Sequence, residues 1–165
     1  MSVTLAFGAP RGRTLKLTTI LCLFVCFSIP VLGLVNYSEF PGPLRWSLML
    51  LPLLFVAGAA PFMVRGYSVT DGALIIHRLG WDFRLELDSL LSVEADAAAL
   101  NGSIRLAGNG GLFAFCGWFR NRKLGVYRAF CTDTAHAVVL RFPDRTVVVT
   151  PDQPEKFVAA IKEMK

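Results

Sequence analysis

Residues 46–78, WSLMLLPLLFVAGAAPFMVRGYSVTDGALIIHR, contain the change of pattern that decides the fold. Residues 46–64 carry no charge and approach the ~20 apolar residues that a helix needs to cross a hydrocarbon core of roughly 30 Å. From Gly66 onward, short apolar runs flank the turn Thr70-Asp71-Gly72, which is typical of two antiparallel strands. The sequence therefore predicts a membrane-spanning helix that leads directly into a β-rich domain.

A second apolar segment precedes this one. Residues 17–35, LTTILCLFVCFSIPVLGLV, are also uncharged and long enough to span a bilayer. The connector 36–45 contains a Pro-Gly-Pro run, so the two helices are expected to form an antiparallel hairpin, with Tyr37 and Trp46 as interfacial anchors. The whole chain is 54% hydrophobic with a mean hydropathy of +0.53, which is too apolar for an ordinary soluble domain.

Positive charges flank the two apolar segments unequally. The flanking basic residues are Arg11, Arg13 and Lys16 before the first segment, Arg45 in the connector, and Arg65, Arg78 and Arg84 after the second. By the positive-inside rule, this predicts a multi-pass protein of the cell inner (plasma) membrane with both termini in the cytoplasm and residues 1–16 as a basic cytoplasmic tail. A cleaved signal peptide is the alternative, but the apolar run is long for one and VLGLVNYS lacks a small-x-small cleavage site.

Residues 66–165 are expected to form one β-rich domain that ends in a helix. WDFRLELD (81–88) alternates apolar and charged residues, which predicts a half-buried strand, and AVVLRFPDRTVVVT (137–150) predicts a hairpin. In the terminal PDQPEKFVAAIKEMK, Asp152 and Glu155 have the spacing of a helix capping box, and apolar residues follow at helical spacing. We expect about seven antiparallel strands followed by a C-terminal helix.

No catalytic, metal or cofactor site is predicted. A nucleophile such as Cys116 would need a histidine base, yet His77 lies in a strand, His136 lies in the turn DTAH, and neither belongs to a recognisable motif. No set of Cys, His, Asp and Glu has the spacing of metal ligands. GNGGLFAFCG (108–117) lacks the lysine and hydroxyl of a phosphate-binding loop, so a turn or bulge is expected there. An enzyme centred on Cys116 or His136 is the least favoured hypothesis.

Three phrases of the domain carry a family resemblance. YSVTDGALII, IRLAGNGGLFAFCGWFRNRKLGVYRAF and VVVTPDQPEKF resemble the bacterial pleckstrin-homology-like (PH-like) domains, which often follow a pair of transmembrane helices. The resemblance covers about residues 66–165 and implies a membrane-anchored α+β protein: a transmembrane hairpin over 17–64, then a PH-like antiparallel β-barrel or sandwich without a catalytic centre. Phosphoinositide-binding relatives hold head groups with basic residues between the first two strands. Here that loop is TDG, which offers an acid and no base.

The stretch GWFRNRKLGVYRAF (117–130) mixes basic and aromatic residues. Its candidate contacts for a lipid headgroup or a partner protein are Arg120, Arg122, Lys123 and Arg128 with Trp118. A solvated turn between two strands produces the same pattern, so that interpretation stays open. Nucleic acid is not expected as a partner, because the chain from Arg65 onward has thirteen basic and eleven acidic residues and no wide basic face.

The sequence thus favours a non-enzymatic, membrane-tethered module that presents its domain to the cytoplasm for protein partner binding or for assembly as a homo-oligomer. The alternative is an anionic-lipid sensor that uses the basic loop 120–128.

Overall fold

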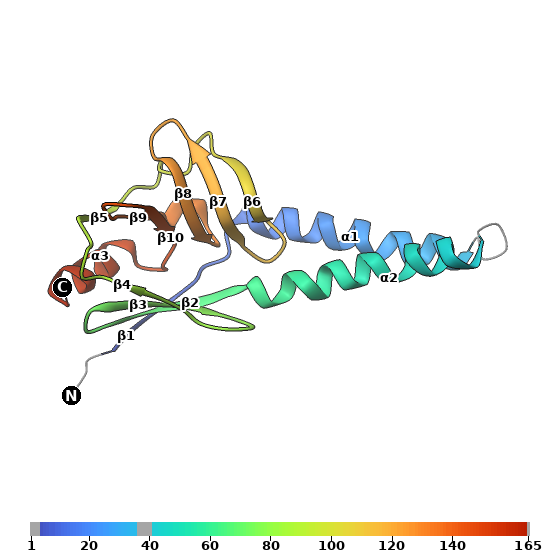
Figure 1. The fold of residues 1–165 in the computed structure, drawn as a ribbon, viewed down its shortest axis with the longest axis horizontal. Helices are drawn as coiled ribbons and strands as arrows, with labels where there is room; N and C mark the ends of the chain where they lie inside the picture. Colours follow the sequence, from blue (N-terminus) through green and yellow to red (C-terminus); the bar gives the residue numbers. More distant parts are fainter. Residues whose placement is uncertain (1–3, 36–40, 165) are drawn as a thin grey trace.

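The computed structural model describes residues 4–35 and 41–164, and two long helices extend from one side of a β-rich domain (Figure 1). The helices are α1 (Arg13–Val35) and α2 (Gly42–Ala59), and the short 3-10 helix η1 (Ala60–Phe62) continues α2. Both long helices begin four residues before the apolar segments 17–35 and 46–64. Pro43 favours the early start of α2, because a proline in the first turn lacks only an N–H group that has no helical partner.

The two long helices pack against each other and present apolar side chains to their surroundings. Within these fully described helices, α2 buries no residue and α1 buries only Leu15 and Gly33. Gly33 faces Met49 of α2 and permits the close approach of the two helices. A helix that is apolar on its exposed faces requires apolar surroundings. By length and composition, both helices are able to cross a membrane.

The domain contains two sheets. The first has the order β1-β2-β3-β4, with β1 (Leu5–Gly8), β2 (Val64–Thr70), β3 (Ala73–Arg78) and β4 (Phe83–Glu86). The second has the order β5-β9-β10-β8-β7-β6, with β5 (Ser92–Ala95), β6 (Ile104–Gly110), β7 (Phe115–Asn121), β8 (Gly125–Cys131), β9 (Val138–Arg141) and β10 (Thr146–Val149). The short helix η2 (Thr134–His136) precedes β9, and α3 (Pro154–Glu163) follows β10.

Of the two predicted forms, an antiparallel β-barrel or a sandwich of about seven strands, the structure has the sandwich, and the number of strands and the direction of one strand pair differ from the prediction. The described strands form two sheets with no hydrogen-bonded pairing between them, so the fold is an open sandwich. The domain that follows α2 has nine described strands, β2 to β10, instead of about seven, and β10 runs parallel to β8. This parallel pair arises because the hairpin β9–β10 places its second strand, β10, next to β8. The predicted hairpins around TDG and between β9 and β10 are both confirmed.

The segment before α1 contributes a strand, where the sequence predicts only a basic tail. β1 pairs antiparallel with β2, and the Gly8 N–H donates a hydrogen bond of 3.1 Å to the Asp152 carboxylate. The capping box at Asp152 is therefore a wrong prediction: Gln153 is the N-cap of α3 and its side chain makes no capping hydrogen bond. The carboxylate that was expected to cap the helix binds the N-terminal segment instead.

The main core lies between the two sheets, and α3 covers the end of the sandwich opposite the long helices (Figure 1). Tyr67 of β2 joins the sheets, because its hydroxyl donates a hydrogen bond of 2.6 Å to the Phe130 carbonyl. Phe157 of α3 packs edge-on against Tyr67 and Phe7, at ring-centre distances of 6.1 and 5.1 Å. The predicted C-terminal helix is confirmed. It does not cover the other end of the sandwich, beside α1 and α2.

Candidate functional site

The basic and aromatic stretch 117–130 forms the hairpin β7–β8, and its candidate residues fall into two groups. Arg120, Arg122 and Lys123 lie at or beside the hairpin turn and are exposed. Lys123 forms an ion pair with Asp96, and this hydrogen bond holds the pKa of Asp96 below its usual range. Trp118 and Arg128 are cross-strand partners in the middle of the hairpin, so they share one face of the sheet, away from the basic turn.

The turn between β6 and β7, at the opposite end of β7 from the basic turn, contacts α1. The Thr19 hydroxyl donates a hydrogen bond of 2.9 Å to the Gly111 carbonyl and accepts one of 3.1 Å from the Phe113 N–H. The seven residues of β7 separate this contact from the basic turn by about 23 Å at the usual rise of a strand. The turn after β6, and not the Arg122 turn, is therefore the part of this sheet that adjoins the long helices.

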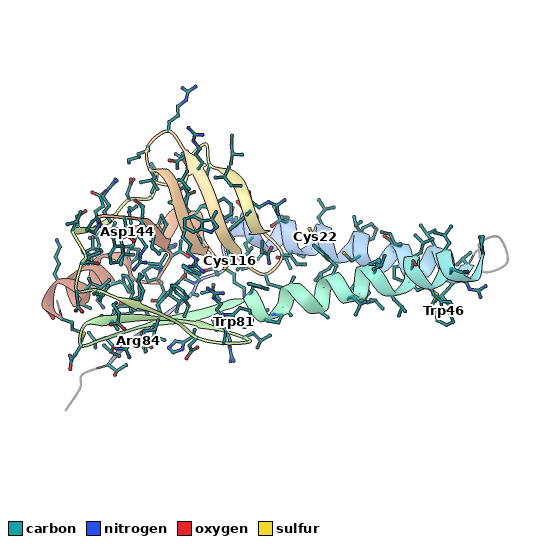
Figure 2. The ribbon with its side chains drawn as sticks, in the orientation of Figure 1. Cys22, Trp46, Trp81, Arg84, Cys116 and Asp144 are labelled. Atoms are coloured by element: carbon teal, nitrogen blue, oxygen red, sulfur yellow. The ribbon has the colours of Figure 1, made fainter. Side chains whose placement is uncertain are left out.

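A pocket of about 510 Å³ lies where the end of α2 meets the two sheets. Its residues are Phe55, Gly58, Ala59 and Phe62 of the α2–η1 segment, Arg78 of β3, Arg105, Ala107, Gly108 and Asn109 of β6, Cys116, Gly117 and Trp118 of β7, and Arg128 of β8. Figure 2 labels Cys116 and Trp81 at this end of the domain. The pocket thus lies between the two sheets at the end of the sandwich next to the long helices.

Arg78 is the most buried charged group of this pocket. It is only 7% exposed, and its Nε and Nη2 atoms are buried without a hydrogen-bond partner. Its guanidinium lies over the ring of Phe130, 4.7 Å from the ring centre, and over Trp81 at 5.5 Å. Burial lowers the pKa of Arg78, and the neighbouring charge of Arg128 lowers it further. Arginine nevertheless stays protonated at neutral pH, so a buried positive charge faces this pocket.

Arg128 lies over the same Phe130 ring as Arg78. Its guanidinium lies 4.5 Å from the ring centre of Phe83 and 5.1 Å from that of Phe130, and the two rings stack at 5.0 Å. Arg105 adds a third guanidinium, which donates to the Gly108 carbonyl at 3.3 Å. The described lining holds no carboxylate. Three cations therefore converge on a cavity in which the described chain supplies no counter-ion.

Of the five predicted contact residues, Arg128 and Trp118 line this pocket, whereas Arg120, Arg122 and Lys123 lie elsewhere. Arg78 and Arg105 are not among the contact residues that the sequence predicts. Arg78 carried a usable signal: it follows Leu74 and Ile76 with period two, which places its side chain on their buried face. No such pattern marks Arg105, because a bulge between Arg105 and Ala107 breaks the alternation of β6.

Comparison with protein families decides the classification of this fold. The family model described as bacterial PH domain matches residues 65–165, more than half of the chain. The chain belongs to the bacterial PH domain family. No curated protein and no solved structure matches it. The match confirms the resemblance carried by the turn and core phrases of residues 66–165.

The PH domain carries a Ser-His-Asp chain on the outer face of its first sheet. The Ser68 hydroxyl lies 2.8 Å from His77 Nε2, and His77 Nδ1 lies 3.0 Å from an Asp82 carboxylate oxygen. This is the order of groups in a hydrolytic triad, but acyl transfer also requires N–H donors for the oxyanion. Ser68 is 7% exposed, and β2 pairs on both sides, with β1 and β3. The neighbouring N–H groups are committed to the sheet, so the arrangement lacks an oxyanion site.

The other candidates for catalysis in the PH domain are also poorly placed. Cys116 is buried, and burial raises the pKa of its thiol, so little of the reactive thiolate forms at neutral pH. His136 hydrogen-bonds to Asp133 at 3.1 Å, within the turn that begins η2. Among the described residues, no three Cys, His, Asp or Glu side chains gather closely enough to hold a metal ion. The glycine-rich stretch 108–117 contains the predicted turn between β6 and β7, and the bulge of β6 lies just before it, between Arg105 and Ala107.

Proposed function

We propose that this PH domain is a non-enzymatic interaction module tethered to the cell inner membrane, with α1 and α2 as a two-span anchor. The observation that carries the proposal is the pairing of β1 with β2, because these strands flank the helical hairpin. Paired strands must lie on the same side of a membrane, so a segment between them crosses an even number of times. Two helices that are apolar on their exposed faces meet this requirement.

The charge distribution supports a cytoplasmic domain. The basic residues at the domain end of the hairpin are Arg11, Arg13, Lys16 and Arg65. The two flanks also touch, since Arg11 Nη2 lies 3.3 Å from the Met63 sulfur. Basic residues are enriched on the cytoplasmic side of spanning helices, so we assign residues 1–16 and 66–165 to the cytoplasm and the connector 36–45 to the outside.

The two aromatic anchors are assigned to the opposite interface. Trp46 lies at the end of the hairpin remote from the domain (Figure 2) and is 56% exposed, as expected for a side chain at the boundary of lipid and water. Tyr37, the second expected anchor, falls outside the described residues.

Edge strand β6 is the surface that we assign to a protein partner or a second copy of the chain. β6 ends its sheet, and its Ile104 and Leu106 side chains are 70% and 55% exposed. Val126 of β8 adds a side chain that is 51% exposed. An open strand edge with apolar side chains favours strand addition by another chain.

The anionic-lipid alternative at the basic turn receives less support. Arg120, Arg122 and Lys123 lie at the end of β7 remote from α1, and Lys123 already pairs with Asp96. Exposed charges lose most of their interaction with a surface beyond a Debye length of about 8 Å at physiological salt.

Membrane extraction and reporter fusions test the anchor. The full-length protein should stay in the membrane pellet after alkaline carbonate, and a reporter at the C-terminus should be active only in the cytoplasm. A reporter inserted in the connector 36–45 should show the opposite behaviour. Release by carbonate, or a C-terminus outside the cell, would contradict the proposal.

Site-specific photocrosslinking in membranes tests the partner surface. A photoreactive residue at Ile104 or Leu106 should yield a crosslinked protein product, either with a copy of this chain or with another protein. The matched control is Arg84, which is exposed on edge strand β4 of the other sheet. Equal yields from β6 and from Arg84, or none from either, would count against β6 as the interface.

A further inference from the structure

The pocket at the end of α2 holds positive charge that the described chain does not balance. Arg78, Arg105 and Arg128 line it, and no described carboxylate forms an ion pair with them. Arg78 is the decisive group, because it is more than nine-tenths buried and two of its three guanidinium nitrogens have no hydrogen-bond partner. Buried polar groups are normally hydrogen-bonded, so the unpaired Arg78 donors beside this cavity favour an acceptor that binds there.

Electrostatics also favours a negatively charged ligand. Arg78 and Arg128 rest on the same ring of Phe130, at 4.7 and 5.1 Å, so two like charges are held close together. Cation–π contacts offset part of the desolvation of each guanidinium but satisfy none of its N–H donors. The end of α2 contributes a partial negative charge of about half an elementary charge, which three arginines exceed. An anion bound between the arginines would relieve both the repulsion and the missing hydrogen bonds.

We propose that this pocket binds a phosphate group through Arg78, Arg105 and Arg128. Arginine suits this ligand, because its planar fork donates two parallel hydrogen bonds to phosphate oxygens. The wall formed by Phe55, Gly58 and Phe62 is apolar and continuous with the exposed face of α2, and Gly58 leaves open space beside it. A phospholipid matches both halves of the pocket, with its phosphate at the arginines and an acyl chain along α2.

This site differs from the turn between β2 and β3. β3 runs from Ala73, beside that turn, to Arg78 at the pocket, so its six residues separate the two places by about 20 Å. The lipid source rests on the proposed membrane anchor, because only an inserted α2 would hold the pocket at the level of the headgroups. A soluble phosphate compound would present the same chemistry without the anchor.

The test uses the full-length protein in a neutral detergent, so it does not depend on membrane insertion. In the first arm, phosphatidylglycerol is added and bound lipid is measured by native mass spectrometry. In the second arm, delipidated protein is titrated with inorganic phosphate and its unfolding temperature is recorded. The variants are Arg78→Gln and Arg128→Gln, and the matched control is the double change Arg120→Gln with Arg122→Gln at the basic turn.

We expect one phosphatidylglycerol per chain in the native protein and in the control, and binding weaker by about ten- to hundredfold in Arg78→Gln and Arg128→Gln. This result supports the site with a lipid source. A rise in unfolding temperature with inorganic phosphate, lost in the same two variants, supports the site with a soluble source. Equal binding by the native protein, the two variants and the control overturns the proposal. A loss of binding in the control alone, or the absence of binding in both arms, overturns it as well.

A further measurement separates ligand binding from a structural role of Arg78. Without ligand, Arg78→Met should unfold at the same temperature as the native protein or higher, because it removes a buried charge that lacks partners. It should then fail to respond to phosphate. A large loss of stability in the ligand-free variant would show that Arg78 is satisfied within the protein and would overturn the proposal. Carbonate extraction reports on the anchor separately, so the two failures are distinguishable.

Discussion

Thr19 of α1 is hydrogen-bonded to Gly111 of the β6–β7 turn, with its hydroxyl 2.9 Å from the carbonyl oxygen. Thr18 donates to the same carbonyl at 3.1 Å, and Thr19 accepts from the Phe113 N–H. The turn has two residues of positive φ, Gly111 at 124° and Phe113 at 69°. The first turns of α1 therefore hold in place a turn of the domain that contains a non-glycine residue of positive φ, Phe113.

Replacement of Thr19 by Val should loosen this turn. Valine keeps the shape of threonine but leaves the partly buried Phe113 N–H without its acceptor, at a cost of about 1–3 kcal/mol. Hydrogen–deuterium exchange should become faster in residues 111–115. Ser28→Ala is the matched control, because the Ser28 hydroxyl bonds only to carbonyls of α1 itself. Unchanged exchange in Thr19→Val would mean that Thr18 alone holds the turn.

Gly117 should tolerate no side chain. Its φ is 144°, and an added Cβ would lie 2.2 Å from the Ala107 carbonyl oxygen of the neighbouring strand. We expect Gly117→Ala to lower the free energy of unfolding by about 2–4 kcal/mol, measured by thermal or denaturant unfolding. Gly102→Ala is the control: its φ is also positive, at 65°, but its surroundings are open, so its loss should be about 1 kcal/mol. Equal losses would refute the backbone clash.

The Ser68–His77–Asp82 chain should not react as a serine hydrolase. A fluorophosphonate probe is expected to leave the native protein unlabelled, because no free N–H donors surround Ser68. Ser68→Ala should retain every binding property of the native protein. Stoichiometric labelling that disappears in Ser68→Ala would establish a catalytic serine and contradict the assignment of this domain as non-enzymatic.

The Lys123–Asp96 pair should contribute little stability, and only above acidic pH. The lowered pKa of Asp96 means that the pair stabilises the fold above the ordinary value of 3.8 and that this contribution is lost as pH falls through the lower, folded-state pKa. Because Lys123 is 54% exposed, Lys123→Met should cost less than about 1 kcal/mol at neutral pH. Unfolding curves at pH 7 and near pH 2 measure this, and a difference that persists in acid would assign the effect to packing.

The parts of the fold that depend on local pattern could be predicted. A few neighbouring residues determine each of these features: the apolar length of α1 and α2, the hairpin turn at Gly72 and the helical spacing around Phe157. The period-two pattern of β4 is confirmed too, with Leu85 buried and Arg84 exposed. Such features need no knowledge of distant segments.

The errors all involve contacts between distant segments. β1 has four residues, three of them exposed, so no periodicity marks it, and its partner lies beyond both long helices. The Asp152 carboxylate was expected to cap the helix that follows it. Nothing in the neighbouring residues indicates that its partner is the Gly8 N–H, 144 residues away. The pocket was missed for the same reason: its arginines come from β3, β6 and β8, and only the packing of the two sheets brings them together.

The pairing of β1 with β2 also sets an order of events during synthesis. The ribosome makes residues 5–8 first, then both long helices, and only afterwards the strand with which residues 5–8 pair. The nascent first strand has no described partner in its sheet until residues 64–70 emerge. If α1 and α2 span a membrane as proposed, translocation of this short first strand across the bilayer would leave the finished sheet one strand short.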